Sequence, residues 1–137
     1  MDGVPLLYNG QEVGDATESG APALFERLPV YWGIRSRRPE FPRFYSWIIP
    51  LRKESTALHG GSLVWVPNSD EDRVITYLRE SERETILVAV NLSNRPFTGT
   101  VQVPQDGFVD MSAAPGPVSL PGLTLEAFGF RFFRRVR

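Results

Sequence analysis

The candidate acids, bases and metal ligands of this 137-residue chain are first its carboxylates and its one histidine, since the chain contains no cysteine. The lack of cysteine excludes disulfides, thiolate metal sites and cysteine nucleophiles. The single histidine, His59, supplies neither a histidine pair for a metal nor a choice of base for a serine nucleophile. Its position directly before Gly60-Gly61 favours a structural role.

The acids lie in two groups near predicted turns: Asp70, Glu71 and Asp72, and then Glu80, Glu82 and Glu84. Adjacent acids in a turn do not reproduce the alternating ligands of a calcium loop. Acidic runs of this kind are typical of solvated hairpin tips. We therefore predict no metal site, no cofactor and no catalytic residue in these groups.

Aromatic side chains are a second source of chemistry, because the apolar C–H faces of sugar rings stack on indole and phenol rings. Trp65 alternates with Leu63 on one face of a predicted strand, which predicts a core position. Trp32 and its neighbour Tyr31 lie in a predicted loop, so they are the candidates for carbohydrate stacking.

These residues must be positioned by a mostly β structure. Short runs separated by turn residues predict strands at Leu63–Val66, Val74–Arg79, Thr85–Asn91, Gly99–Val103, Phe108–Met111, Val118–Leu120, Leu123–Ala127 and Phe130–Phe133. Two-residue alternation is visible in the second and fourth of these runs. Regular short strands of this kind predict an antiparallel β-sandwich. Ser81–Glu84 is a predicted hairpin loop, and Phe132-Phe133 should place one ring on each side of its strand.

One helix is predicted before the strands, from about Pro39 to Glu54. Phe44, Trp47, Ile48 and Leu51 recur at three- and four-residue spacing and form an apolar stripe. Pro50 should kink or end this helix, since proline lacks the N–H that a helix interior uses. We expect the stripe to cover the β-domain or to pack on a second copy of the chain.

The N-terminal part is less able to fold alone. Val4 to Tyr8 form an apolar run bounded by the turn residues Asn9-Gly10, a pattern typical of a strand buried on both faces. Asp15 to Ala23 read as irregular chain. These differences predict two parts, residues 1–58 and residues 59–137.

Composition excludes some classes of partner. Fifteen basic and sixteen acidic residues give a net charge of −1, which argues against nucleic acid or an anionic membrane as partner. The arginines at 131, 134, 135 and 137 are interpreted as a solvated chain end. The N-terminus does not have the pattern of a secretory signal, and no apolar run reaches membrane-spanning length, so a cytoplasmic location is expected.

The order of the motifs resembles the C-terminal portion of α-amylase-family glycoside hydrolases. The motifs that carry this resemblance are Gly3–Gly14, Pro29-Val30-Tyr31-Trp32, Phe44–Lys53 and Val88–Ser93. They are similar, in that order, to the last barrel strand and its turn, the following loop, the final barrel helix and a strand of the C-terminal β-domain. In the loop motif, Tyr31 stands where the family usually has an acid.

The resemblance implies an antiparallel β-sandwich preceded by one helix and by a strand and loop that derive from a (β/α)8 barrel. Gln11 and Glu12 would then lie at the barrel rim on the substrate side. Retaining glycosidases need two carboxyl groups roughly 5 Å apart. In the family these groups lie on earlier barrel strands, so no activity is expected for this chain alone.

The resemblance therefore implies a catalytically incomplete accessory domain of an enzyme that acts on α-glucosidic carbohydrate. Its expected partners are the missing catalytic barrel or a second copy of the chain, with α-glucan as a possible ligand. The alternative is a stand-alone interaction or self-association module that does not bind carbohydrate.

Overall fold

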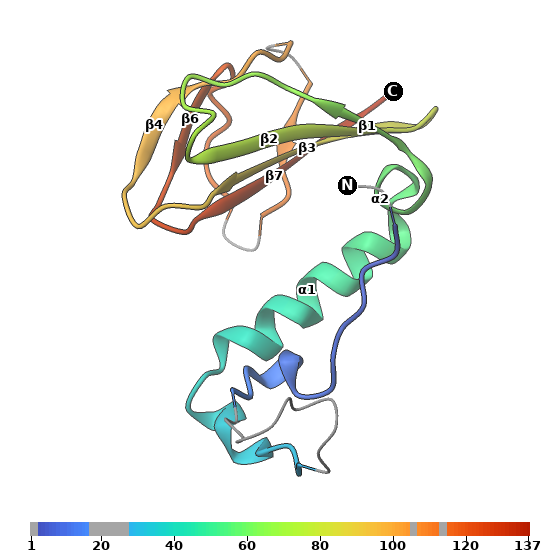
Figure 1. Ribbon diagram of the computed structural model, residues 1–137. Coiled ribbons are helices and arrows are strands. Elements are labelled where there is room, and N and C mark those ends of the chain that lie inside the picture. The colour runs from blue at the N-terminus through green and yellow to red at the C-terminus, as the bar shows by residue number, and fades with distance from the viewer. Residues whose placement is uncertain (1–2, 17–27, 105–106, 113–114) are drawn as a thin grey trace. The chain divides into compact units, whose positions relative to one another are not determined.

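The computed structural model of the protein describes residues 3–16, 28–104, 107–112 and 115–137 (Figure 1). They fall into two compact units, Gly3–Leu51 and Arg52–Arg137. The predicted division after residue 58 stays a prediction.

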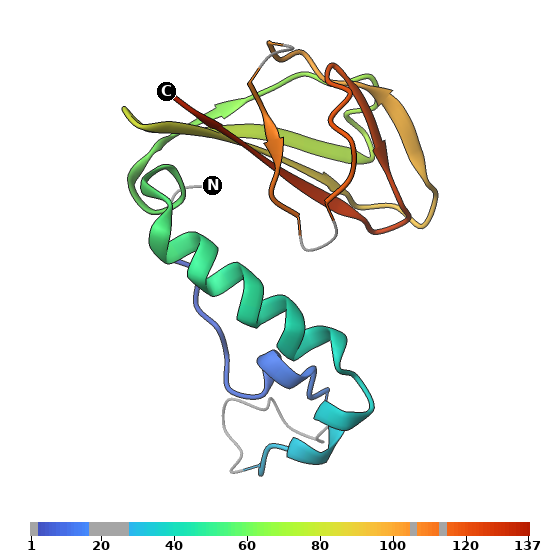
Figure 2. The same ribbon diagram turned by 180° about the vertical axis from the view of Figure 1, so that it is seen from behind.

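The larger unit is built around a five-stranded antiparallel sheet with the order β1-β2-β3-β7-β5. Its strands are β1 (Ser62–Trp65), β2 (Val74–Glu80), β3 (Glu84–Asn91), β7 (Phe130–Val136) and β5 (Val109–Asp110). A second antiparallel sheet pairs β4 (Phe97–Thr100) with β6 (Gly122–Leu125). Figure 2 shows the same strands from behind.

The main core lies between the two sheets. Val74, Leu87 and Phe133 enter it from the large sheet, and Leu123 and Leu125 enter it from the small sheet. Leu87 and Phe133 are direct partners in the β3–β7 ladder, so their side chains share one face. The two-residue alternation of β3 and β7 thus produces the predicted β-sandwich.

The opposite face of the large sheet holds a smaller cluster under a second helix, α2 (Thr56–Gly60). Ala57 of α2 packs with Ile86 and Val88 of β3, and Phe132 packs against the same cluster. The prediction that Phe132 and Phe133 face opposite sides of the sheet is therefore confirmed. Sequence analysis did not predict α2, because five residues are too few to show helical periodicity.

The smaller unit contains η1 (Gln11–Val13), η3 (Trp32–Ser36) and most of α1 (Glu40–Glu54). The predicted helix is confirmed within one residue. Pro50 lies inside α1 and does not end it, since four further helical residues follow. The predicted kink at Pro50 stays a prediction. No side chain of α1 is buried, so its apolar stripe remains partly open to solvent.

Two predicted strands are absent from the described chain. Val4–Tyr8 has no strand structure, because the described residues of Gly3–Leu51 contain no strand with which it could pair. Val4 and Leu6 are 87% and 85% exposed. Val118–Leu120 also forms no strand, and the breakers Pro117 and Pro121 on either side explain this.

A search of the described helices finds none that is both long and apolar enough to cross a membrane.

Candidate functional site

A tight turn around η1 positions the two rim residues predicted from the sequence. Gly10 and Gly14 flank η1 with φ angles of 92° and 72°, in the left-handed region that favours glycine. At Gly14 an added Cβ would lie 2.9 Å from the ring of Phe41, so a side chain there would also collide with α1. The backbone N–H of Asp15 closes the turn by donating to the carbonyl of Gly10 at 3.0 Å.

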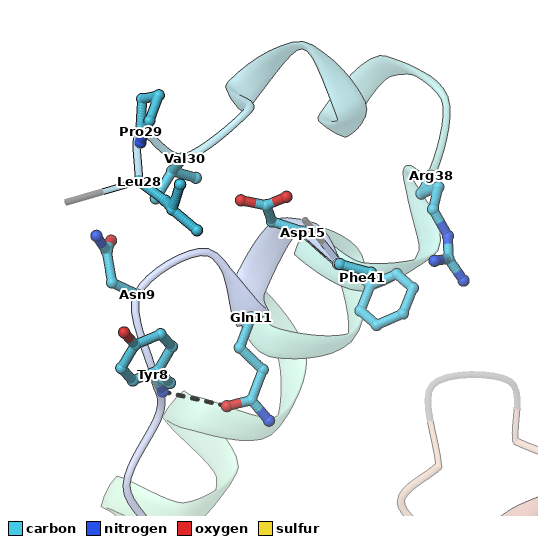
Figure 3. Close-up of a pocket in the computed structure, with 11 residues that line it drawn as sticks. Tyr8, Asn9, Gln11, Asp15, Leu28, Pro29, Val30, Arg38 and Phe41 are labelled. Atoms are coloured by element: carbon cyan, nitrogen blue, oxygen red, sulfur yellow. Dashed lines mark hydrogen bonds between the residues drawn. The ribbon is translucent and has the colours of Figure 1, made fainter. Parts of the chain in front are cut away.

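One groove beside η1 has a volume of about 450 Å³ (Figure 3). Its lining combines the polar side chains of Gln11, Asp15 and Arg38 with the rings of Tyr8 and Phe41. Gln11 Oε1 accepts a hydrogen bond from the backbone N–H of Tyr8 at 3.1 Å. Gln11 therefore holds its own turn while it lines the groove.

A second groove, of about 490 Å³, brings together two of the predicted residues. Glu12 and Trp32 both line it, together with Tyr45 of α1. Glu12 Oε2 accepts a hydrogen bond from the backbone N–H of Gly10 at 2.9 Å, so this carboxylate is held in place. Trp32 is 56% exposed, as expected for a stacking residue.

Tyr31 lines neither groove. Its side chain is exposed, and its ring lies against Gly33, where an added Cβ would meet the ring at 3.2 Å. Its backbone N–H donates to Asp15 Oδ2 at 3.3 Å. The structure thus places Tyr31 next to Trp32 in the chain but outside the groove that Trp32 lines.

Among the described residues, neither groove beside η1 is lined by the pair of carboxyl groups that retaining hydrolysis needs. In this part of the chain, Asp15 is the one carboxylate that lines the first groove, and Glu12 is the one that lines the second. Across the described residues, no three acid, histidine or cysteine side chains gather as a metal site would require.

Glu84 corrects the prediction that the acids near Ser81 are solvated. Its side chain is 2% exposed, and Oε1 accepts hydrogen bonds from Ser55 Oγ at 2.6 Å and from the backbone N–H of Ala57 at 3.2 Å. Arg134 Nε lies 2.7 Å from Oε2. Burial alone would raise the pKa of Glu84, but these hydrogen bonds and the Arg134 charge outweigh it and lower the pKa.

The C-terminal arginines are also not a solvated chain end. Arg131 pairs with buried Asp110, Arg134 with Glu84, and Arg137 with Glu80 at 2.9 Å. The guanidinium of Arg135 lies 5.0 Å from the centre of the Phe108 ring. These residues belong to β7 or directly follow it, so they join neighbouring strands of the large sheet.

Asp110 is buried on β5, and both oxygens of its carboxylate accept hydrogen bonds. Its carboxylate accepts hydrogen bonds from the backbone N–H of Ser112 at 2.8 Å and of Gly116 at 2.9 Å, and from Arg131. Burial raises its pKa, but the bonds from Ser112, Gly116 and Arg131 outweigh that effect and lower the pKa below its ordinary value.

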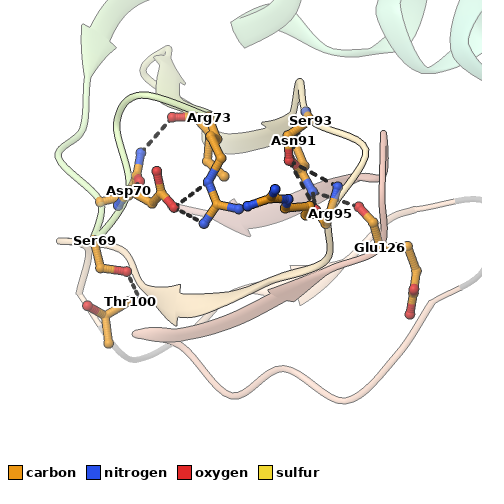
Figure 4. Close-up of polar contacts among 10 residues, drawn as sticks. Ser69, Asp70, Arg73, Asn91, Ser93, Arg95, Thr100 and Glu126 are labelled. Carbon is orange, nitrogen blue, oxygen red and sulfur yellow. Dashed lines mark hydrogen bonds and ion pairs between the residues drawn. The ribbon is translucent and has the colours of Figure 1, made fainter.

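Asn91, in the motif Val88–Ser93, makes hydrogen bonds that link the end of β3 to two later segments of the chain (Figure 4). Asn91 is buried, and its amide donates to the carbonyls of Arg95 at 2.7 Å and Glu126 at 2.9 Å. Its Oδ1 accepts from the backbone N–H of Ser93 at 3.0 Å and from the Ser93 hydroxyl at 2.8 Å. One side chain thus fixes the exit of β3 and the turn before β7.

Figure 4 also shows Asp70, which was predicted to be a solvated turn acid. It pairs with Arg73, and the side-chain hydrogen bond from Arg73 lowers its pKa. Its backbone N–H donates to Asn68 Oδ1 at 2.8 Å. Asp70 therefore orders the turn before β2.

Trp65 corrects a second prediction, because it is 58% exposed instead of buried in the core. β1 is the edge strand of the large sheet, so no further strand covers its outer side. Periodicity shows which residues share a face of a strand, but it does not show whether the strand lies at an edge. The following Pro67, which cannot donate to a sheet, is the sequence signal that could have indicated an edge.

The sequence is similar to a known family of amylase domains. Residues 65–132 match the family described as maltogenic amylase, C-terminal domain. The chain is 30% identical over 102 residues to α-amylase 2 of Dictyoglomus thermophilum, covering 69% of this chain and 17% of that protein. It is 32% identical over 91 residues to a cyclomaltodextrinase of a Bacillus species, covering 65% and 15% respectively.

Solved structures give the same fold. A mutant of the trehalulose synthase MutB matches with a TM-score of 0.56 and 27% identity, over 71% of this chain and 18% of that one. The trehalose-6-phosphate hydrolase of Bacillus licheniformis matches with a TM-score of 0.57 over the same shares, and its 17% identity shows the fold alone.

The fold and these matches define the chain as an accessory domain of an amylase-type enzyme. More particularly, the chain corresponds to the C-terminal portion of α-amylase-family glycoside hydrolases. It spans about one sixth of the length of the curated relatives that it matches.

Proposed function

We propose that this chain completes and stabilises the catalytic barrel of a glycosidase that acts on α-glucosidic carbohydrate, and that it does not hydrolyse carbohydrate alone. The observation that carries the proposal is the exposed N-terminal segment. Val4 and Leu6 are more than four-fifths exposed, and the backbone of Val4–Tyr8 has no strand partner in the described unit to which it belongs. Apolar chain with unpaired backbone groups is stabilised when neighbouring strands cover it.

The helix that follows supports the same role. α1 carries an apolar stripe, yet none of its side chains is buried. A helix gains most of its stability in a protein from packing such a face against another element. A barrel would supply that cover for both the segment and the helix.

The groove lined by Glu12 and Trp32 supports a place for this part of the chain near carbohydrate. Trp32 offers an exposed indole face, and Glu12 offers a carboxylate whose position is fixed by the Gly10 N–H. In this proposal, Trp32 stacks on a sugar ring and Glu12 accepts hydrogen bonds from its hydroxyls. Gln11 holds the turn by accepting the N–H of Tyr8, and exposed Tyr31 offers a ring outside this groove.

Two measurements on purified proteins test the proposal. The chain alone should release no sugar from maltoheptaose or cyclomaltodextrin. A chimera should then join this chain to the Bacillus cyclomaltodextrinase from which the matching C-terminal segment has been removed. We expect the chimera to hydrolyse cyclomaltodextrin and the truncated enzyme to be inactive.

Sugar release by the chain alone would contradict the proposal. So would a folded chimera that is no more active than the truncated enzyme. A chimera that carries Val4→Asp and Leu6→Asp is the matched variant. It should lose activity, because both side chains would place charge where the barrel strand is covered.

A further inference from the structure

The exposed ring of Trp65 lies on the β-domain, in a different unit from the groove of Trp32. Trp65 and Tyr77 are directly opposite each other in the β1–β2 ladder. Their ring centres are 5.7 Å apart, with an angle of 71° between the planes, so they make an edge-to-face pair. Tyr77 therefore packs against one side of the indole while more than half of Trp65 stays exposed.

A groove of about 330 Å³ lies beside this indole. Asn68, Glu71 and Ile75 line it together with Trp65 and Pro67. The volume lies at the lower end of the range for small-ligand sites, which is enough for a short stretch of sugar units. We call this feature the Trp65 groove.

The floor of the Trp65 groove is held rigidly. The amide of Asn68 donates to the Val74 carbonyl at 2.9 Å and to Thr76 Oγ1 at 3.0 Å. Thr76 Oγ1 in turn donates to the Val66 carbonyl at 2.5 Å. A site that is already ordered loses little conformational entropy when a ligand binds.

Glu71 supplies the free polar group. Among the residues that the structure describes, it has neither a hydrogen-bond partner nor an ion-pair partner, and it is exposed at the groove. Its carboxylate oxygens can therefore accept hydrogen bonds from a ligand. A platform for an apolar ring face beside a free acceptor is the combination that a neutral polyol fits.

Pairing with another protein strand fits this edge less well. β1 has only four residues and is followed by Pro67, which lacks a backbone donor. Short edge strands and proline are devices that resist strand addition. The features of this edge therefore favour a ligand that stacks on Trp65 over a second copy that extends the sheet.

We propose that the Trp65 groove is a binding site for an α-glucan chain on the β-domain, with Trp65 stacking on a sugar ring and Glu71 accepting hydrogen bonds from its hydroxyls. The α-glucan class rests on the proposed function above. All residues that line the site lie within Arg52–Arg137.

The three tryptophans of the chain allow a direct test, because each indole N–H gives its own signal in a ¹H–¹⁵N spectrum. The full chain is titrated with maltoheptaose and, separately, with the β-linked cellohexaose. Single variants of Trp32, Trp47 and Trp65 assign the signals. We expect the Trp65 signal to shift with maltoheptaose and not with cellohexaose.

Variants then test the contacts. Trp65→Ala should weaken maltoheptaose binding by about ten-fold or more, and Trp65→Phe should recover part of that loss because it keeps an aromatic face. Glu71→Gln should weaken binding by a few-fold and leave thermal stability unchanged. Trp32→Ala, as the matched control, should leave the Trp65 shift intact.

An unmoved Trp65 signal in the folded chain would overturn the proposal, whether or not the Trp32 signal moves. Affinity that is unchanged in a folded Trp65→Ala variant would do the same. A dimer seen by sedimentation, which Trp65→Ala dissociates and maltoheptaose does not affect, would assign the face to a second copy instead. The proposed function fails on different evidence, since it is read from the activity of the chimera.

Discussion

The hydroxyl of Ser55 lies 2.6 Å from Glu84 Oε1 and joins the start of α2 to the start of β3, although the two residues are 29 positions apart. The same hydroxyl accepts the N–H of Leu58 at 3.2 Å and so caps α2. Glu84 Oε1 also accepts the N–H of Ala57. The buried carboxylate of Glu84 therefore accepts a backbone N–H from the first turn of α2 and links this helix to β3 of the large sheet.

Replacing Glu84 should destabilise the β-domain strongly. Glu84→Ala removes the acceptor for Ser55 and Ala57 and should lower the free energy of unfolding by about 3 kcal/mol. Glu84→Gln keeps one acceptor and should cost about 2 kcal/mol. Urea unfolding followed by circular dichroism measures both changes.

The matched control for Glu84 is Glu82, which is exposed in the same hairpin. Glu82→Gln should change the free energy of unfolding by less than about 0.5 kcal/mol. Equal effects of Glu82→Gln and Glu84→Gln would show that the buried contacts of Glu84 do not stabilise the fold.

Stability should fall in acid. The folded-state pKa values of Glu84 and Asp110 are both lowered, so the unfolded chain binds more protons than the folded chain in acid. Their contribution is present above the unfolded pKa values of about 4 and is lost as the pH falls through the lower folded values. Thermal melts between neutral pH and about pH 3 should show this decline, and Glu84→Gln should make it shallower.

An acidic side chain at the position of Asn91 should destabilise the fold. Asn91→Asp turns a donor toward the carbonyls of Arg95 and Glu126 into an acceptor, so it should cost about 3 kcal/mol at neutral pH. The neighbouring Asn94 is exposed, and Asn94→Asp should be nearly neutral. If chemical denaturation gives the two variants similar stabilities, the structural role assigned to Asn91 is wrong.

The adjacent glycines at the end of α2, Gly60 and Gly61, should respond differently to replacement by alanine. An added Cβ at Gly61 would lie 2.5 Å from the Glu80 carbonyl oxygen and 2.6 Å from that of Ala57, so Gly61→Ala should cost about 2 kcal/mol. At Gly60, in α2, an added Cβ meets nothing within 4 Å. Gly60→Ala should therefore be neutral or stabilising by up to about 1 kcal/mol, and calorimetric melts compare the two.

The parts of the fold that follow a local period could be predicted. β2 alternates along its length, β3 is a continuous apolar run, and α1 repeats every three or four residues, so the sequence predicts these elements within one residue at each end. β7 extends three residues beyond its predicted end at Phe133. α2 could not be predicted in this way, because it is short and depends on Ser55 and on the distant Glu84 for its start. Val4–Tyr8 has the pattern of a strand, but a strand also needs a partner.

The exposure of some candidate site residues could be predicted from the sequence, and that of others could not. The sequence correctly predicts an exposed Trp32, although Trp32 begins η3 instead of lying in an irregular loop. It misassigns Glu84 and Trp65, whose burial depends on which elements lie across from them. The spacing of Glu84, Ile86 and Val88 on one face of β3 is the signal that could have indicated a buried acid.

In the proposed role, Val4–Tyr8 becomes a covered strand when a barrel is present. Amide hydrogen exchange of these residues should be compared between the chain alone and the active chimera. We expect exchange near the rate of unstructured chain in the chain alone, and exchange slower by at least about a hundred-fold in the chimera. Equal, fast exchange in both proteins would contradict it.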